Sequence, residues 1–174
     1  MNGYFSVTLP TKKYIKACLV NQMGESPIMN SRSRFGGYFV DLLQRKTDKF
    51  DPVNARYNTS LKVYINKHLY YQRGGNLLNK DIKKFNQFVE EDIKCRLHFL
   101  LDYYNLFQPG FEPHIAKVRE KLGIDIEAWS DDSMKKQWYR YRKEEKKPLI
   151  YLKQTVPEIQ KFNPETMLFN PDPG

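Results

Sequence analysis

The longest regular pattern of apolar residues lies between residues 79 and 106. Apolar side chains recur there at steps of three and four, at Ile82, Phe85, Val89, Ile93, Leu97, Leu100 and Tyr104. The stripe is widened by Phe88, Cys95 and Phe99. This period is typical of an amphipathic helix, for which Asn79 is a good N-cap and Pro109-Gly110 a stop. The pattern predicts a central core helix of about 25 residues.

The first 78 residues favour β-structure, because aromatic and β-branched residues are concentrated there and Leu61, Val63 and Ile65 alternate with polar neighbours. An alternation with a period of two places the apolar side chains on one face of a strand. Strands are expected at Tyr4–Leu9, Tyr14–Val20 and Leu61–Ile65. Between and after them we expect a short helix over Gly37–Gln44, polar loops over Asn30–Gly37 and 46–58, and a closing turn at Gly74-Gly75.

Two shorter helices are expected after the long one. Pro113 suits the first position of a helix, and Gly123 suits a left-handed residue at its end, with Ile124 folding back in a Schellman motif. Ser130, Asp131 or Asp132 can cap the next helix, which continues to about Glu145. The pair is helix-turn-helix-like, but the link is longer than usual and Arg119 stands where that motif usually has a small residue.

The chain from Pro148 onward holds five of the ten prolines, which exclude long helices. We expect an extended arm over 148–174, with a strand at Leu149–Leu152. Its many apolar residues predict that it docks on its own chain or on a second copy as a homodimer. The predicted fold is α+β: a small N-terminal antiparallel sheet packed on the long helix, then the helix-turn-helix-like pair and the arm. Residues 1–147 are expected to form one domain, β-leaning over 1–78 and helical over 79–147.

Charge adds a preference for anionic partners. The net charge is +9, and residues 1–78 hold twelve basic against four acidic residues. In the helix Asp131–Glu145 the apolar and basic side chains lie on different sides. Met134, Trp138 and Tyr141 share one side. The remaining surface carries basic residues and one aromatic residue: Lys135, Lys136, Tyr139, Arg140, Arg142 and Lys143. Such cations neutralise phosphates, and arginine can also bind guanine edges in a major groove. The alternative is a solvated charged helix surface, balanced in part by Glu144 and Glu145.

A second candidate surface lies in the N-terminal part. Basic residues there, including Arg32, Arg34 and Arg73, are interleaved with tyrosine and phenylalanine. A sheet with basic and aromatic side chains on its polar face can stack single-stranded bases. A solubilising surface over core aromatic residues explains the same pattern.

Enzyme chemistry has little support in the sequence. The only histidines are His68, His98 and His114, and neither a metal-binding HExxH motif nor a phosphate-binding GxxxxGK[ST] loop occurs. The acidic runs Glu90–Asp92 and Asp125–Glu127 could hold Mg²⁺ for a nuclease, although helix-surface acids explain both. We therefore expect no catalysis, no cofactor and no metal. The two cysteines, Cys18 and Cys95, are expected as buried thiols in a reducing cytoplasm, and no apolar run is long enough to cross a membrane.

The run LGIDIEAWSDDSMKKQWYRYRK (residues 122–143), with KDIKKFNQFVEEDIK (80–94) upstream, resembles sequences of small uncharacterised proteins of bacterial mobile elements and prophages. The resemblance covers roughly 61–143. It implies a bacterial cytoplasmic protein involved in the maintenance or regulation of such an element, and it implies no catalytic residues. The sequence thus predicts a non-enzymatic DNA-binding protein, with duplex DNA favoured. The alternative is a protein-interaction or assembly module whose basic surface meets an acidic partner.

Overall fold

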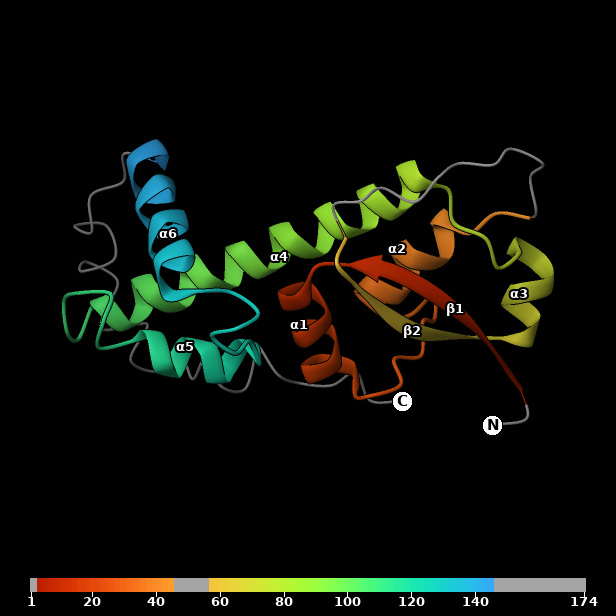
Figure 1. Ribbon diagram of the computed structural model, residues 1–174, viewed down its shortest axis with the longest axis horizontal. Coiled ribbons are helices and arrows are strands. Elements are labelled where there is room, and N and C mark those ends of the chain that lie inside the picture. The colour runs from red at the N-terminus through yellow and green to blue at the C-terminus, as the bar shows by residue number, and fades with distance from the viewer. Residues whose placement is uncertain (1–2, 46–56, 146–174) are drawn as a thin grey trace. The chain divides into compact units, whose positions relative to one another are not determined.

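The computed structural model describes residues 3–45 and 57–145 of the chain (Figure 1). Within these ranges the elements in order are β1 (Tyr4–Thr11), α1 (Lys13–Met23), α2 (Arg34–Leu42), β2 (Thr59–Asn66), α3 (Lys67–Arg73), α4 (Asn79–Asn105), α5 (Ile115–Leu122) and α6 (Asp131–Glu145). The predicted α+β class is confirmed. The expected arm over 148–174, its strand and the homodimer through it lie outside the described residues, as does most of the loop expected at 46–58.

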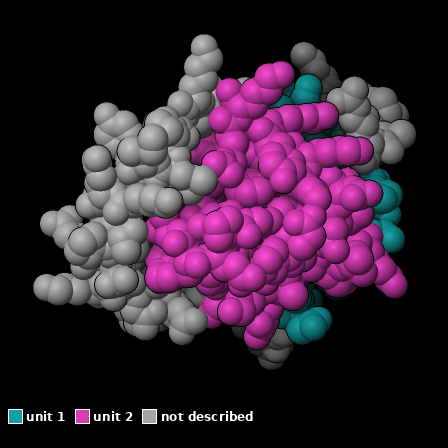
Figure 2. Space-filling view, turned by 90° about the vertical axis from the view of Figure 1, so that its left-hand side faces the viewer, with its two compact units in different colours: residues 1–91 teal, residues 92–174 magenta. Residues whose placement is uncertain are grey.

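The chain divides into two compact units, residues 1–91 and 92–174, which Figure 2 shows in different colours. The boundary falls inside α4. The first unit contains the sheet, α1 to α3 and the beginning of α4, and the described part of the second contains the rest of α4 with α5 and α6.

The sheet consists of β1 and β2 in antiparallel register, with Val7 opposite Val63 and Leu9 opposite Leu61. These four side chains are buried, so the alternation seen in the sequence does place an apolar face on the core. On the other side of β2, the Met29 N–H donates to the Tyr64 carbonyl over 2.7 Å, and the Tyr64 N–H donates to the Pro27 carbonyl over 2.8 Å. The strand β2 is therefore central, and β1 lies at the edge.

The strand expected at Tyr14–Val20 is wrong, because this segment is the helix α1. Ile15, Cys18 and Leu19 are its buried residues, at the spacing of a helical face. A short apolar run fits either a strand or a helix, and burial of this face decides for the helix. Gly24 ends α1 with a φ of 82°, which favours glycine, and its N–H donates to the Val20 carbonyl.

Two boundaries near α2 and α3 also differ from expectation. The helix α2 begins at Arg34, inside the segment expected as a loop, because the Ser33 hydroxyl accepts the Gly36 N–H over 3.1 Å and caps the helix. The helix α3 was not expected at all. Asn66 caps it by accepting the Leu69 N–H over 2.8 Å, and Gly74 therefore ends a helix and not a strand segment.

The predicted long helix is confirmed as α4, and Phe85, Val89, Ile93 and Leu97 on its stripe have no exposed surface. Asn86 joins this helix to the sheet, because its side-chain nitrogen donates to the Pro10 carbonyl over 3.0 Å.

The stripe is narrower than the sequence suggested. Cys95 is exposed, not buried, and the Phe99 side chain is 44 % exposed. At 100° per residue both lie roughly 100° or more from the centre of the stripe, which explains the error. Among the described helices, none is long and apolar enough to cross a membrane.

Candidate nucleic-acid interface

The end of α5 has the geometry that the sequence predicted. Gly123 adopts a left-handed conformation with φ 64° and ψ 33°. Its N–H donates to the Glu120 carbonyl over 3.2 Å, and the Ile124 N–H donates to the Arg119 carbonyl over 3.1 Å. This is a Schellman motif, and Ile124 is buried, as the residue after the glycine often is in this motif. The helix begins at Ile115, slightly later than expected, so Pro113 lies in the turn before it.

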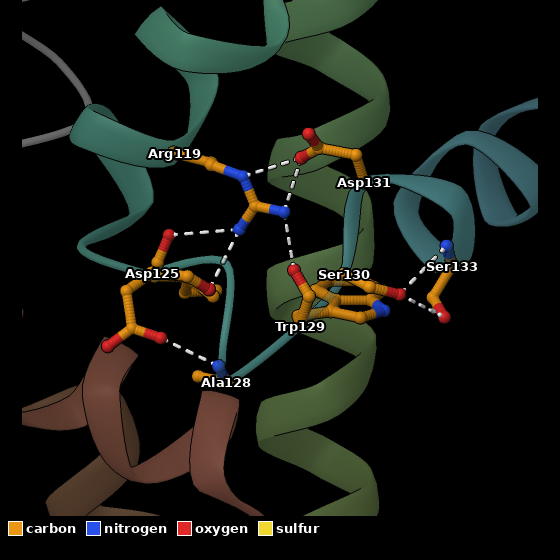
Figure 3. A network of polar contacts seen from close by, with 8 residues as sticks. Arg119, Asp125, Ala128, Trp129, Ser130, Asp131 and Ser133 are labelled. Carbon is orange, nitrogen blue, oxygen red and sulfur yellow. Dashed lines mark hydrogen bonds and ion pairs between the residues drawn. The ribbon is translucent and has the colours of Figure 1, made fainter.

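Arg119 organises the link between α5 and α6 (Figure 3). Its Nη1 donates to the main-chain carbonyls of Ile124 and Asp125, the latter over 2.8 Å, and its Nη2 donates to the Trp129 carbonyl. Its Nε donates to the Asp131 carboxylate over 2.7 Å, and the two side chains form an ion pair. The side chain of Arg119 is only 13 % exposed, so these bonds are partly shielded from water.

This network explains why an arginine stands where a helix-turn-helix usually has a small residue. The longer link turns three main-chain carbonyls toward Arg119, and each of them needs a donor. A guanidinium group has five N–H donors in a fixed plane, so one Arg119 side chain satisfies Ile124, Asp125 and Trp129 together.

Further short-range bonds complete the link and start α6. The Asp125 carboxylate accepts the Ala128 N–H over 2.6 Å. The Ser130 hydroxyl accepts the Ser133 N–H over 3.4 Å, so Ser130 is the cap among the three expected candidates. Figure 3 shows both contacts beside the arginine network. The start of α6 is therefore fixed by its own link.

The inner side of α6 is fixed by burial. Met134 has no exposed surface and Trp138 is 1 % exposed, as the sequence predicted. The ring of Tyr141, which is half-buried, stacks on His98 of α4 with 3.9 Å between the ring centres. Because three successive turns of α6 are held in this way, the opposite side of the helix faces solvent.

Four of the predicted site residues form what we call the basic stripe: Lys136, Tyr139, Arg140 and Lys143. All four are exposed, and Tyr139 is 51 % exposed. Their spacing of three and four residues places them on one side of the helix. None of the three cations has an ion pair with a residue of the described chain.

The other two predicted residues of α6 have partners. Lys135 forms an exposed ion pair with Glu112, and the hydrogen bond between them lowers the pKa of Glu112 and raises the pKa of Lys135. The guanidinium of Arg142 lies 5.0 Å from the centre of the Trp138 ring, in a cation–π contact. Both residues are therefore less available to a ligand than the members of the basic stripe.

The predicted site residues near the N-terminus belong to the first unit. Arg32 is exposed just before the cap of α2, and Arg73 is exposed in the last turn of α3. Arg34 is exposed at the start of α2, with its guanidinium 5.3 Å from the centre of the Phe88 ring. Aromatic side chains gather near one end of this sheet, where Phe5 stacks on Tyr70 at 4.0 Å.

Reasoning from the sequence missed two residues that support the site. One is Arg119, which was noted only as a departure from a motif. The other is Asp102 of α4, which accepts the Trp138 indole N–H over 3.0 Å. A buried indole N–H predicts that an acceptor exists, but no local pattern identifies which residue supplies it. Over the described ranges, no group of three His, Cys, Asp or Glu residues is placed to hold a metal ion.

Comparison with known proteins gives no family. No family model, no curated protein and no solved structure matches this chain. The resemblance to proteins of mobile elements therefore stays an expectation, and the geometry of α5, its link and α6 carries the functional inference.

Proposed function

We propose that this chain is a non-enzymatic nucleic-acid-binding protein that binds duplex DNA through the basic stripe of α6. The observation that carries the proposal is the exposure of Lys136, Arg140 and Lys143 on one side of a helix without ion pairs to described residues. A cation without an ion pair in the protein does not have to break one in order to bind a phosphate. The full free energy of counterion release is then available for binding.

Duplex DNA is favoured over a single strand because the stripe lies on a helix. A major groove about 12 Å wide admits an α-helix, and the second helix of a helix-turn-helix enters it in this way. In that position Arg140 can donate to a guanine edge or to a phosphate, while Lys136 and Lys143 meet the backbone. Because Arg119 already holds the link in place, α6 does not lose conformational entropy through ordering of the link when DNA binds.

The resemblance to proteins of bacterial mobile elements suggests a context for this binding. We place the protein in the cytoplasm, where it would regulate or maintain such an element. The excess positive charge of residues 1–78 offers additional phosphate contacts, with Arg32, Arg34 and Arg73 as exposed candidates.

A salt titration of binding to a labelled duplex tests the proposal. The wild-type chain is compared with a Lys136→Ala, Arg140→Ala, Lys143→Ala triple variant, with EDTA present throughout. Each phosphate contact contributes about 0.9 to the slope of log affinity against log salt, so the triple variant should lose roughly two to three units of slope. A matched control removes three exposed lysines elsewhere, Lys13, Lys80 and Lys83.

The control separates a specific surface from net charge, because both triple variants lose the same charge. The proposal requires a weak effect of the control and a strong effect of the stripe variant. Equal losses would mean that only total charge matters. A wild-type chain whose affinity does not respond to salt would contradict DNA binding and favour a protein partner.

A further inference from the structure

The outer edge of β1 offers main-chain hydrogen-bonding groups to a partner. Within an antiparallel ladder, residue pairs alternate between those that exchange hydrogen bonds and those that do not. The Lys67 N–H donates to the Gly3 carbonyl over 2.9 Å, so the pair of Gly3 and Lys67 is a hydrogen-bonded pair. Continuing the register, odd-numbered residues of β1 direct their main-chain groups toward β2, and even-numbered residues direct theirs outward.

Two further observations agree with this alternation. Tyr64 is opposite Ser6, and its N–H and carbonyl bond away from β1 to Pro27 and Met29. Pro10 has no N–H, and it stands at an even position, where β2 requires none. The outward groups of β1 are therefore those of Tyr4, Ser6, Thr8 and Pro10.

The open part of this edge is short and well defined. The Pro10 carbonyl already accepts the Asn86 side chain of α4, which closes the edge at that end. Tyr4, Ser6 and Thr8 remain, all three exposed, and their outward main-chain groups have no hydrogen bond within the described residues. The open edge is thus centred on Ser6.

We propose that the open edge of β1 is a self-association surface that pairs antiparallel with β1 of a second copy, on a two-fold axis at Ser6. In this register Ser6 pairs with Ser6 of the second copy, and Tyr4 pairs with Thr8 of the second copy. Every outward N–H of these residues then meets an outward carbonyl, because even positions oppose even positions. The two sheets join into one continuous sheet.

Charge and side chains favour a second copy as the occupant. A protein with a net charge of +9 repels its own copies, but β1 carries no charged residue. Edge strands are commonly protected by lysine or by a bulge, and β1 has neither over Tyr4–Thr8. On the exposed face, the Tyr4 ring would lie beside Thr8 of the second copy, a favourable aromatic and β-branched pair. This inference does not depend on the proposed DNA binding.

Sedimentation equilibrium of the full chain from about 1 μM to about 1 mM tests the proposal, a range that covers weak dimers. We expect a concentration-dependent dimer. Ser6→Pro removes the central N–H from each copy while sparing the β1–β2 ladder, since position 6 bonds outward as Pro10 does. It should weaken the dimer by more than about tenfold, equivalent to about 1.4 kcal/mol. The control Ser6→Thr keeps the N–H and should leave the dimer intact.

A cysteine pair tests the register without relying on the proline variant. In a Cys95→Ser background, Ser6→Cys places two thiols at the two-fold axis, with Cα atoms about 5.5 Å apart, a distance that a disulfide spans. Mild oxidation should join two Ser6→Cys chains. Thr8→Cys should not cross-link, because its copies lie roughly 14 Å apart at about 3.4 Å per residue.

Three results would overturn the proposal. They are a wild-type chain that stays monomeric throughout the concentration range, an undiminished dimer in a folded Ser6→Pro variant, and equal cross-linking at positions 6 and 8.

Discussion

The indole nitrogen of Trp138 in α6 donates a hydrogen bond to the Asp102 carboxylate in α4 over 3.0 Å. The indole is almost fully buried, so its N–H would lose its hydrogen bond to water without this acceptor. The bond therefore fixes both the depth and the rotation of α6. Rotation matters most, because it decides which basic residues face outward.

Arg140 and Arg142 should respond differently to alanine substitution. Arg140→Ala should weaken duplex binding and reduce the salt slope by about 0.9 without changing stability. Arg142→Ala should lower stability by about 0.5–1 kcal/mol, because it removes the cation–π contact with Trp138. Binding titrations and thermal melting of the two single variants check this. Identical behaviour of the two would show that the assigned contacts are wrong.

Arg119 should be required for the link between α5 and α6. Arg119→Ala leaves the Ile124, Asp125 and Trp129 carbonyls without their donor and removes the ion pair with Asp131, so we expect a loss of about 3 kcal/mol. Arg119→Lys keeps the charge but not the planar set of donors, and should recover less than half of this loss. Urea unfolding measures both. Full recovery by lysine would mean that charge alone accounts for the role of Arg119.

Removal of Glu112 should strengthen DNA binding. Glu112 holds Lys135 in an ion pair, and a phosphate must compete with it. Glu112→Gln should raise the salt slope by up to about 0.9, the value of one additional phosphate contact. Glu120→Gln, another exposed position, controls for the change in net charge. An equal increase in DNA affinity and salt slope in the two variants would show that the effect comes from net charge alone.

The core stripe of α4 predicts a large contrast between two phenylalanines. Phe85 has no exposed surface, so Phe85→Ala should cost about 3–5 kcal/mol through the cavity it leaves. Phe99 is 44 % exposed, and Phe99→Ala should cost less than about 1 kcal/mol. Denaturant unfolding compares them directly. Similar losses would show that Phe99 is covered in solution.

Tyr14 should make the fold sensitive to alkaline pH. Burial, together with the nearby Glu90 carboxylate, raises the pKa of Tyr14. The contribution of Tyr14 to the free energy of unfolding is complete below the pKa of about 10 that tyrosine has in the unfolded chain. Above that pH only the unfolded chain ionises at Tyr14, so the stability falls by up to about 1.4 kcal/mol per pH unit. Tyr14→Phe should lose less stability between pH 10 and 11. Lys12, whose amino group is 3.2 Å from the Tyr14 hydroxyl, is present in both proteins. Parallel stability curves would contradict the assignment.

The parts of the fold that could be predicted from sequence are those with local, repeated signals. Three signals can be recognised within a few residues of sequence: the apolar stripe of α4, the alternation in β2 and the glycine that ends α5. The helix α3 could not be found in this way, because it has no buried residue and hence no apolar period. The apolar residues of the segment that forms α1 are too few to distinguish the period of a strand from that of a helix. Only tertiary packing decides between the two structures.

The candidate site shows the same division. The inward direction of Met134 and Trp138 follows from helical spacing, so the sequence is sufficient to predict it. The pairing of Lys135 with Glu112 is a contact between residues far apart in the chain, and no spacing rule indicates it. For Arg119, the sequence shows a cation but not the carbonyls that the link turns toward it.

The helix α4 runs without interruption through residues 91 and 92, where the two compact units meet along the chain. A chain divided there would give each fragment only part of this helix, with apolar side chains and main-chain groups newly exposed to water. Each unit therefore depends on the other for the completion of this helix, and a break between residues 91 and 92 should destabilise both.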